Sequence, residues 1–168
     1  MLSDFKRIDP ERVPDNLIGL IRGGMLVTCG TPDKFNTMTA NWGGMGYLWN
    51  KPVCFVFIRP SRYTFGFAEE NNTMSLSFFT DEYKDVLMFC GSKSGRDVDK
   101  VSACKLTPVQ LPGKCVAFNE ARLVLECRKL SAADFEPGQF IDSSINMFYK
   151  DNNYHRMYIC EITGVYTK

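Results

Sequence analysis

The fold is decided by one segment of the sequence, KPVCFVFIRPSRYT at residues 51–64. Every residue from Val53 to Ile58 is apolar, a pattern typical of a central strand that is covered on both faces. The run stops at RPSRYT, where a short helix is expected to begin and to continue to Glu70. We therefore expect a buried strand that leads directly into a helix and anchors the core.

Further segments on both sides of this strand combine β-branched or aromatic residues with turn signals at their ends. In MSLSFF, residues 74–79, apolar residues alternate with two serines, which gives a strand with one apolar face. The same alternation runs from Leu123 to Cys127. The expected strands are Met25–Thr31, Thr37–Trp42, Val53–Ile58, Met74–Phe79, Ala117–Leu130 and Arg156–Tyr166.

Helical patterns are fewer and shorter than strand patterns. The clearest one has the i, i+3, i+4, i+7 spacing of a buried helix face, and its residues are Tyr83, Val86, Leu87 and Cys90. Thr80 or Asp81 could cap its start. Two other short helices are expected at about Asp15–Arg22 and at Arg62–Glu70. Because strands outnumber helices and do not alternate with long ones, an antiparallel β-barrel with inserted helices fits better than a doubly wound parallel sheet.

The composition is that of one globular domain. The 168 residues are 45% hydrophobic and 23% charged, and no repeat or linker divides them, so we expect a single domain over residues 1–168. The formal net charge of +1 gives no global field that would gather nucleic acid or acidic lipid. The longest apolar run is far shorter than the roughly 20 residues that cross a membrane. We therefore expect neither nucleic acid nor a membrane as a partner.

The cysteines indicate buried free thiols. There are 7, an odd number, and no two form a C-x-x-C pair, which disfavours a zinc knuckle or a dithiol redox motif. Most lie among apolar residues, where a thiol behaves as a small hydrophobe. Free thiols, together with an N-terminus that lacks the pattern of a secretory signal, indicate the reducing cytoplasm.

The familiar nucleotide and catalytic motifs do not occur in the sequence. Neither G-x-x-x-x-G-K-[ST] nor G-x-G-x-x-G is found, and GGMG at residues 43–46 has neither spacing. GSKSG at residues 91–95 has Lys93 where a nucleophile elbow requires serine. His155 is the only histidine, so a two-histidine metal site cannot form and we expect no metal. A hydrolase triad would have to use that same histidine and is poorly supported.

Three polar segments at strand or helix ends are candidates for a ligand site. The first is NTMTANWGG, residues 36–44, in which Thr37, Thr39 and Asn41 share one face of the expected strand. Such a polar stripe either faces water or lines a polar ligand. Trp42 offers a flat apolar surface that suits either an aromatic ligand ring or the core.

The second segment is RPSRYT, at the expected start of a helix. Ser61 could cap this helix, whose first backbone N–H groups would point outward. The guanidinium groups of Arg59 and Arg62 and the hydroxyls of Ser61 and Thr64 would suit phosphate oxygens. The alternative is an ordinary capped helix with solvated arginines.

The third segment is SKSGRDVDK, residues 92–100, a Ser- and Gly-containing turn with alternating charges. It could bind an anion. Considered alone, it fits a solvated loop better.

Taken in order, these segments resemble the flavin reductase-like, or flavoredoxin-like, family, which has the FMN-binding split-barrel fold. The resemblance covers most of the chain. It rests on the order and spacing of the segments quoted above, together with KLTPV at residues 105–109 and YHRMYICEITGVY at residues 154–166. It implies a homodimer of six-stranded antiparallel split β-barrels of Greek-key type with a few short helices, and FMN held noncovalently near the dimer interface.

The resemblance also implies a set of cofactor-binding residues. The family's ring-binding strand falls on residues 38–42, and its phosphate-binding turn falls within residues 59–64. The loop at residues 94–100 resembles a second polar contact to the ribityl-phosphate end. By this correspondence the implied FMN-binding residues are Met38, Thr39, Ala40, Asn41, Trp42, Arg59, Ser61, Arg62, Thr64, Ser94, Arg96 and Lys100.

The activity implied by the resemblance is that of an oxidoreductase in which NADH or NADPH reduces the bound flavin. FMN is favoured over FAD, and no side-chain nucleophile or base is required because the flavin itself carries the hydride chemistry. Some relatives have a histidine in a GDH-type turn near the nicotinamide. This chain has NYH there, so His155 is a candidate for that contact, or else a surface or dimer-contact histidine.

The sequence leaves the electron acceptor open. Free flavin destined for a partner oxygenase and a different electron acceptor are both compatible with it. An alternative function is that of a flavin-binding electron carrier or storage protein without an efficient NAD(P)H reaction. A third is a noncatalytic interaction barrel that binds no flavin.

Overall fold

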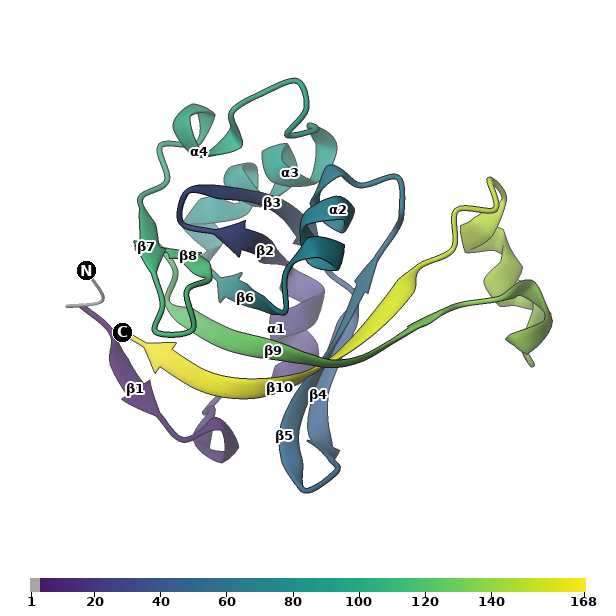
Figure 1. Ribbon diagram of the computed structural model, residues 1–168, viewed down its shortest axis with the longest axis horizontal. Coiled ribbons are helices and arrows are strands. Elements are labelled where there is room, and N and C mark those ends of the chain that lie inside the picture. The colour runs from purple at the N-terminus through teal and green to yellow at the C-terminus, as the bar shows by residue number, and fades with distance from the viewer. Residues whose placement is uncertain (1–3) are drawn as a thin grey trace.

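The computed structural model describes residues 4–168, in which a curved antiparallel sheet is surrounded by short helices (Figure 1). Residues 1–3, which the domain expected over residues 1–168 includes, lie outside the described part. The strands are β1 Lys6–Ile8, β2 Met25–Thr31, β3 Lys34–Ala40, β4 Gly43–Leu48, β5 Lys51–Ile58, β6 Thr73–Phe78, β7 Pro108–Gln110, β8 Val116–Phe118, β9 Leu123–Asp134 and β10 Arg156–Thr167.

The helices are all short. The α-helices are α1 Leu17–Gly23, α2 Tyr63–Glu70, α3 Lys84–Ser92 and α4 Lys100–Ala103. The 3₁₀ helices are η1 Pro10–Arg12, η2 Asp81–Tyr83, η3 Pro137–Gln139 and η4 Ser143–Tyr149. Over residues 4–168, no helix has the length and apolar character needed to cross a membrane.

The main sheet follows the strand order β3-β2-β6-β9-β10-β5-β4, with β1 paired to β10, and all of its pairs are antiparallel. β7 and β8 form a separate hairpin. The mainly β, antiparallel split-barrel class predicted from the sequence is thus confirmed. The sheet is eight-stranded instead of six-stranded because β1 and β4 add to the six strands that the sequence predicted.

The two ends of this strand order, β3 and β4, are joined by only two residues, Asn41 and Trp42. The three Cα–Cα steps from Ala40 to Gly43 span at most about 11 Å. The edges of a flat sheet of seven strands would lie roughly 29 Å apart. The sheet must therefore curl until its two edges approach each other at Asn41 and Trp42, which places the first polar segment at the split of the barrel.

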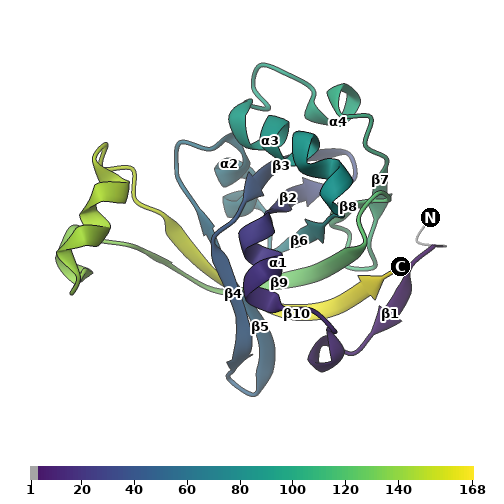
Figure 2. The same cartoon turned by 180° about the vertical axis from the view of Figure 1, so that it is seen from behind.

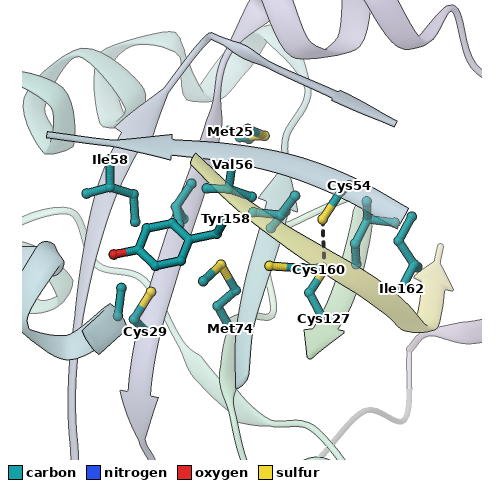
Figure 3. Close-up of a cluster of buried hydrophobic side chains, with 14 of the residues drawn as sticks. Met25, Cys29, Cys54, Val56, Ile58, Met74, Cys127, Tyr158, Cys160 and Ile162 are labelled. Carbon is teal, nitrogen blue, oxygen red and sulfur yellow. Dashed lines mark hydrogen bonds between the residues drawn. The ribbon is translucent and has the colours of Figure 1, made fainter. Parts of the chain in front are cut away.

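The inside of the barrel is filled by apolar side chains, many of which contain sulfur (Figure 3). Cys54 Sγ lies 3.5 Å from Cys127 Sγ, and Cys160 packs beside them. All seven cysteines are free, and only Cys104 is not buried. Burial raises the pKa of the Cys29 thiol to about 12, so that this group stays protonated. The cysteines are structural, as the sequence predicted.

β5 carries the apolar run that anchors this core. Its inward residues Cys54, Val56 and Ile58 are fully buried, whereas the outward Phe55 and Phe57 are partly exposed. The expectation of a strand covered on both faces therefore holds at Val53, which is fully buried, but is wrong for the outer face at Phe55 and Phe57. The reason is that Phe57 borders two cavities instead of packing under a helix.

A second apolar cluster lies outside the barrel and attaches α3 and the β7–β8 hairpin to the sheet. Leu87 and Cys90 on α3 are buried in it, and Tyr83 and Val86 pack against it, which confirms the helix face predicted from the sequence. Thr80, however, forms no side-chain cap, and the 3₁₀ helix η2 intervenes before α3 begins. On the other side of the molecule, α1 lies across the sheet near β4 (Figure 2).

Several strands differ from the expected ones. The strand expected over Thr37–Trp42 is β3, Lys34–Ala40, so that Asn41 and Trp42 lie beyond its end. The sequence did not predict β4, because Gly43, Gly44 and Gly46 are typical of a turn. The expected strand Ala117–Leu130 is divided into β8 and β9 by a turn at residues 119–122.

Residues 135–155, which we call the arm, connect β9 to β10 and project away from the barrel (Figure 1). Its aromatic rings stack on one another. The Tyr149 ring lies 5.5 Å from that of Phe140 at 7° and 4.8 Å from that of Tyr154 at 19°. No strand or helix was predicted for this region.

Gly30 should be required for the β2–β3 hairpin. Its φ is +122°, and a Cβ at this position would lie 2.4 Å from the Lys34 carbonyl oxygen. Replacing Gly30 by Ala is expected to lower the free energy of unfolding by about 1–3 kcal/mol, as measured by urea denaturation. Gly66→Ala is the matched control: its Cβ would meet open space within α2, and it should raise stability by about 0.5–1 kcal/mol. A Gly30→Ala protein as stable as the wild type would contradict the described hairpin.

Candidate functional site

A cavity of about 200 Å³ lies at the split of the barrel. It brings together the end of β3, the two-residue link to β4, the end of β5 and the start of β10. Its lining residues are Met38, Thr39, Ala40, Asn41, Trp42, Phe57, Arg59, Arg62 and His155. The first two polar segments, which are separate in the sequence, thus border the same cavity, and His155 joins them.

β3 offers free backbone groups along this cavity, because it is an edge strand that pairs only with β2 among the described strands. The Thr37 carbonyl oxygen accepts hydrogen bonds from Lys100 Nζ at 2.8 Å and Asn36 Nδ2 at 3.3 Å. Since these two donors occupy both lone pairs, this carbonyl points away from β2. By the two-residue alternation of an antiparallel strand, the backbone N–H and C=O of Thr39 point to the same open edge.

The threonine side chains of this strand are not available to a ligand. Thr37 is buried, and its hydroxyl lies 2.9 Å from that of Thr28. Thr39 Oγ1 donates to the Leu87 carbonyl at 2.5 Å. The polar stripe therefore neither faces water nor lines a ligand through these hydroxyls, because α3 and β2 satisfy them. Of the three stripe residues, Thr39 and Asn41 line the cavity, and the Thr39 hydroxyl is already bonded to α3.

The corner at residues 59–62 is in contact with the arm. Arg59 donates to the Phe148 carbonyl at 2.8 Å and lies 3.6 Å from a carboxylate oxygen of Asp151. Ser61 Oγ accepts a hydrogen bond from Asn153 Nδ2 at 2.6 Å. Arg59 and Ser61 are therefore paired with arm residues, which the sequence did not indicate.

The start of α2 is uncapped. Arg62 is the N-cap residue and no side chain bonds to the first backbone N–H groups, so the prediction that Ser61 caps the helix is wrong. Arg62 instead extends its guanidinium to the carbonyls of Gly91, at 2.8 Å, and Cys90, at 3.4 Å. Partial burial lowers the pKa of Arg62, which still remains a cation at neutral pH. An uncapped helix start beside two arginines is an environment that favours an anion.

Other implied cofactor residues lie outside the 200 Å³ cavity. Thr64 is buried and its hydroxyl accepts from Asn36 Nδ2 at 2.7 Å. Lys100 is buried and donates to the carbonyls of Thr37 and Cys90, both at 2.8 Å. Burial lowers the pKa of Lys100 to about 8. Both side chains hold the strand that borders the cavity instead of facing it.

The loop at residues 94–99 lies against the corner from the other side. Ser94 Oγ accepts from the backbone N–H of Arg96 at 3.2 Å. The Arg96 guanidinium sits 4.9 Å from the centre of the Tyr63 ring and donates to the Ser61 carbonyl at 3.4 Å. Arg96 and Lys100 border a separate polar cavity of about 590 Å³. Of this third segment, only Arg96 therefore reaches the corner.

His155 is buried in the wall of the cavity. Its ring lies 5.3 Å from that of Trp42 and 6.4 Å from that of Phe57, and its Nδ1 is 2.9 Å from the Tyr149 hydroxyl. Desolvation, aided by the charge of Arg59, lowers the pKa of His155 to about 4. The imidazole is therefore neutral at physiological pH.

An apolar cavity of about 480 Å³ adjoins the first one and shares Asn41, Trp42 and Phe57 with it. Its other walls come mainly from α1 and β4, including Ile18, whose side chain is exposed. Sequence patterns did not indicate Phe57, Tyr149 or this cavity as parts of a site. Phe57 could have been found from the apolar run that ends at the corner, whereas the arm carried no comparable signal.

Comparison with known proteins identifies the domain type. The family model "Flavin reductase like domain" matches residues 19–168 of the chain. No curated protein matches the chain. In residues 4–168, no group of three or more His, Cys, Asp or Glu side chains is placed to hold a metal ion.

Solved structures share the fold at low sequence identity. Flavoredoxin from Methanosarcina acetivorans is 23% identical with a TM-score of 0.70, over 86% of this chain and 68% of that one. An FMN-binding domain of a flavin reductases-like enzyme from Shewanella baltica is 17% identical with a TM-score of 0.71, over 97% and 76%. Nitrilotriacetate monooxygenase component B from Mycobacterium thermoresistibile is 9% identical with a TM-score of 0.67, over 88% and 69%.

The low pKa of His155 should make the fold sensitive to mild acid. The pKa falls from the usual 6.5 to about 4 in the folded protein, so between these values only the unfolded chain binds the proton. The contribution of neutral His155 to the free energy of unfolding should be fully present above pH 6.5. It should decrease as the pH falls, by about 1–2 kcal/mol at pH 5. Urea denaturation between pH 5 and 8 measures this.

The control is His155→Gln. Because the chain has a single histidine, this variant should lose most of the pH dependence between pH 5 and 7, whatever its absolute stability. An equal slope in both proteins would show that His155 is not buried in its neutral form.

Proposed function

The chain belongs to the flavin reductase-like domain family, and from this premise we propose that it is an oxidoreductase that binds FMN and transfers electrons from NADH or NADPH to flavin or to another acceptor. The observation that supports it best is the shared cavity: an edge strand with free backbone groups and a corner with two arginines border the same space. We further propose that residues 1–168 form one such domain.

The edge of β3 fits the pyrimidine side of an isoalloxazine ring. That side of the ring alternates carbonyl oxygens with a ring N–H, and the open edge at Thr39 alternates backbone N–H and C=O groups in the same way. Trp42 and Phe57 provide flat apolar surfaces beside it. The residues from Met38 to Trp42 would therefore hold the ring, mainly through their backbone.

The corner fits the phosphate of FMN. Arg59 and Arg62 supply charge, and the uncapped start of α2 supplies free backbone N–H groups. Ser61 supplies a hydroxyl once its contact with Asn153 opens. Arg96 can add to this corner, since it already reaches Ser61. Thr64, Ser94 and Lys100 would act indirectly, by fixing the strand and the loop around the cofactor.

The cavities support a site to which a second copy of the chain contributes. A volume of 200 Å³ is less than the roughly 300–1,000 Å³ that is usual for a complete small-molecule site. The adjoining apolar cavity is open to solvent along α1, where Ile18 is 82% exposed and Trp42 is 41% exposed. We propose that a homodimer covers this surface and encloses the ring.

The protein's own part in the chemistry is placement. Bound FMN supplies the hydride-accepting and electron-transferring chemistry. The chain orients it by the strand edge, neutralises its phosphate with Arg59 and Arg62, and limits water through Trp42, Phe57 and the buried His155. Because His155 is neutral at physiological pH, it adds a polar contact without adding charge.

The structural neighbours support two kinds of electron acceptor, and the free thiols support a location. A protein of the same fold is component B of a monooxygenase, which supports a flavin-using oxygenase as partner, while the flavoredoxin neighbour supports transfer to another electron acceptor. The free thiols support the reducing cytoplasm as the location.

The phosphate assignment predicts the effect of removing the corner. The double variant Arg59→Ala and Ser61→Ala should raise the dissociation constant for FMN at least about 30-fold, because charge-assisted hydrogen bonds to phosphate are lost. Fluorescence titration of FMN measures this. Arg12→Ala, which removes an equal charge from the exposed helix η1, should leave the affinity unchanged.

A second control tests whether the contact between Arg59 and the arm is itself needed for FMN binding. Asp151→Ala removes the carboxylate beside Arg59 and should leave FMN binding unchanged or make it tighter. Unchanged FMN affinity in the double variant Arg59→Ala and Ser61→Ala would contradict the proposed phosphate site.

The enzyme proposal is tested by the rate at which NADH or NADPH bleaches the bound flavin. Stopped-flow absorbance should show reduction that is much faster than that of free FMN under the same conditions. Slow bleaching of a tightly bound flavin would favour the electron carrier instead, and a protein that binds no FMN would favour a noncatalytic barrel.

A further inference from the structure

The only histidine of the chain is paired with a tyrosine of the arm. Tyr149 and His155 are both buried, and the Tyr149 hydroxyl lies 2.9 Å from His155 Nδ1. Their rings meet edge to face at 5.6 Å. The contact spans only six residues and links the end of η4 to the start of β10.

The chemistry of the pair sets the direction of the hydrogen bond. Burial raises the pKa of Tyr149, so its hydroxyl keeps its proton at neutral pH. Within residues 4–168, His155 Nδ1 is the one hydrogen-bond partner of this hydroxyl. A buried hydroxyl proton requires an acceptor, so the hydroxyl donates and Nδ1 accepts. A neutral imidazole whose Nδ1 accepts must carry its proton on Nε2.

The Nε2 atom is open to solvent. It makes no hydrogen bond with the described residues. If it were also buried, it would be a buried atom without a partner, but among the described residues Ser77 Oγ is the only side-chain N or O atom of that kind. Nε2 is therefore reached by solvent, and His155 borders the 200 Å³ cavity. The residue that carries this free N–H thus lines the space next to Trp42 and Phe57.

The Tyr149 ring is fixed independently of the histidine. It stacks on Phe140 and Tyr154, and the Arg59 guanidinium lies 5.3 Å from its centre. These contacts hold the hydroxyl in place through the ring. Removing the hydroxyl alone should therefore leave the stack intact.

We propose that Tyr149 is a positioning residue that holds His155 in the tautomer with Nε2 protonated, so that the cavity presents an uncharged hydrogen-bond donor. Such a donor suits a neutral acceptor, such as a carbonyl oxygen of a ring or carboxamide, better than a carboxylate. The identity of the ligand that accepts this hydrogen bond rests on the proposed function. The tautomer itself is a property of the free protein.

The first experiment measures the tautomer without any ligand. In protein labelled with ¹⁵N-histidine, the single imidazole should give at pH 7.5 one unprotonated nitrogen at Nδ1 and one protonated nitrogen at Nε2. In Tyr149→Phe, which keeps the aromatic ring, the Nδ1-protonated form should become appreciable. Tyr154→Phe is the matched control, because the Tyr154 hydroxyl forms no hydrogen bond with the described residues, and its spectrum should equal that of the wild type.

The second experiment measures the consequence for the cavity. Tyr149→Phe should lower the affinity for FMN or the rate of its reduction by NAD(P)H about 2- to 10-fold, while Tyr154→Phe should not. A purely structural role would affect thermal unfolding and leave the tautomer unchanged, so both variants are also compared by melting temperature.

The outcomes separate the two proposals. A wild-type spectrum with the proton on Nδ1, or a Tyr149→Phe spectrum that equals the wild type, overturns the positioning role even if FMN binds. The expected tautomers in a protein that binds no FMN support the pair and overturn the flavin function instead. The expected tautomers with unchanged FMN binding and reduction in Tyr149→Phe would show that the donor is not used, which also overturns the proposal.

Discussion

The structure depends on one covalent constraint, the two-residue link between the edge strands of the sheet. A sheet of seven strands can be joined edge to edge by Asn41 and Trp42 only if it rolls up, and this rolling creates the enclosed volume that the apolar side chains fill. The same constraint decides where the site lies. At the split the sheet ends in an edge strand, so backbone groups of β3 remain free beside Trp42, which the link itself supplies.

The arm is the part of the structure that couples the corner to the cavity. It contacts Arg59 and Ser61 through residues of η4 and the following turn, and it delivers His155 to the wall of the cavity. The ion pair between Arg59 and Asp151 is long, at 3.6 Å, and Asp151 is 61% exposed. Exposed ion pairs of this kind contribute about 0–1 kcal/mol. A phosphate that bonds directly to a guanidinium can therefore replace it at little cost.

The sequence predicted the strands well where burial follows a simple period. All six expected strands have counterparts in the main sheet. Alternation indicated Met74–Phe79 and the stretch from Leu123, a continuous apolar run indicated Val53–Ile58, and helical spacing identified Leu87 and Cys90 as the buried face of α3. β4 was not found, since its glycines have no side chains to show a pattern. The pairing of Arg59 and Ser61 with the arm was not predictable either: Asn153 is 92 residues from Ser61 in the chain, and no periodicity reports such a contact.

The candidate site shows the same limit at the level of single residues. Polar residues at the right places in the sequence were expected to contact a ligand, but Lys100 and Thr64 support the edge strand through Thr37 and Asn36. An unpaired edge invites pairing with another chain, which proteins prevent by covering it with charged groups or by twisting it away. Here Lys100 and Asn36 cover the edge at Thr37, while the edge at Thr39, two residues further on, stays open toward the cavity. Because Lys100 covers the edge only at Thr37, the backbone groups at Thr39 remain available to form hydrogen bonds with a flat ring that lies against the edge of the sheet.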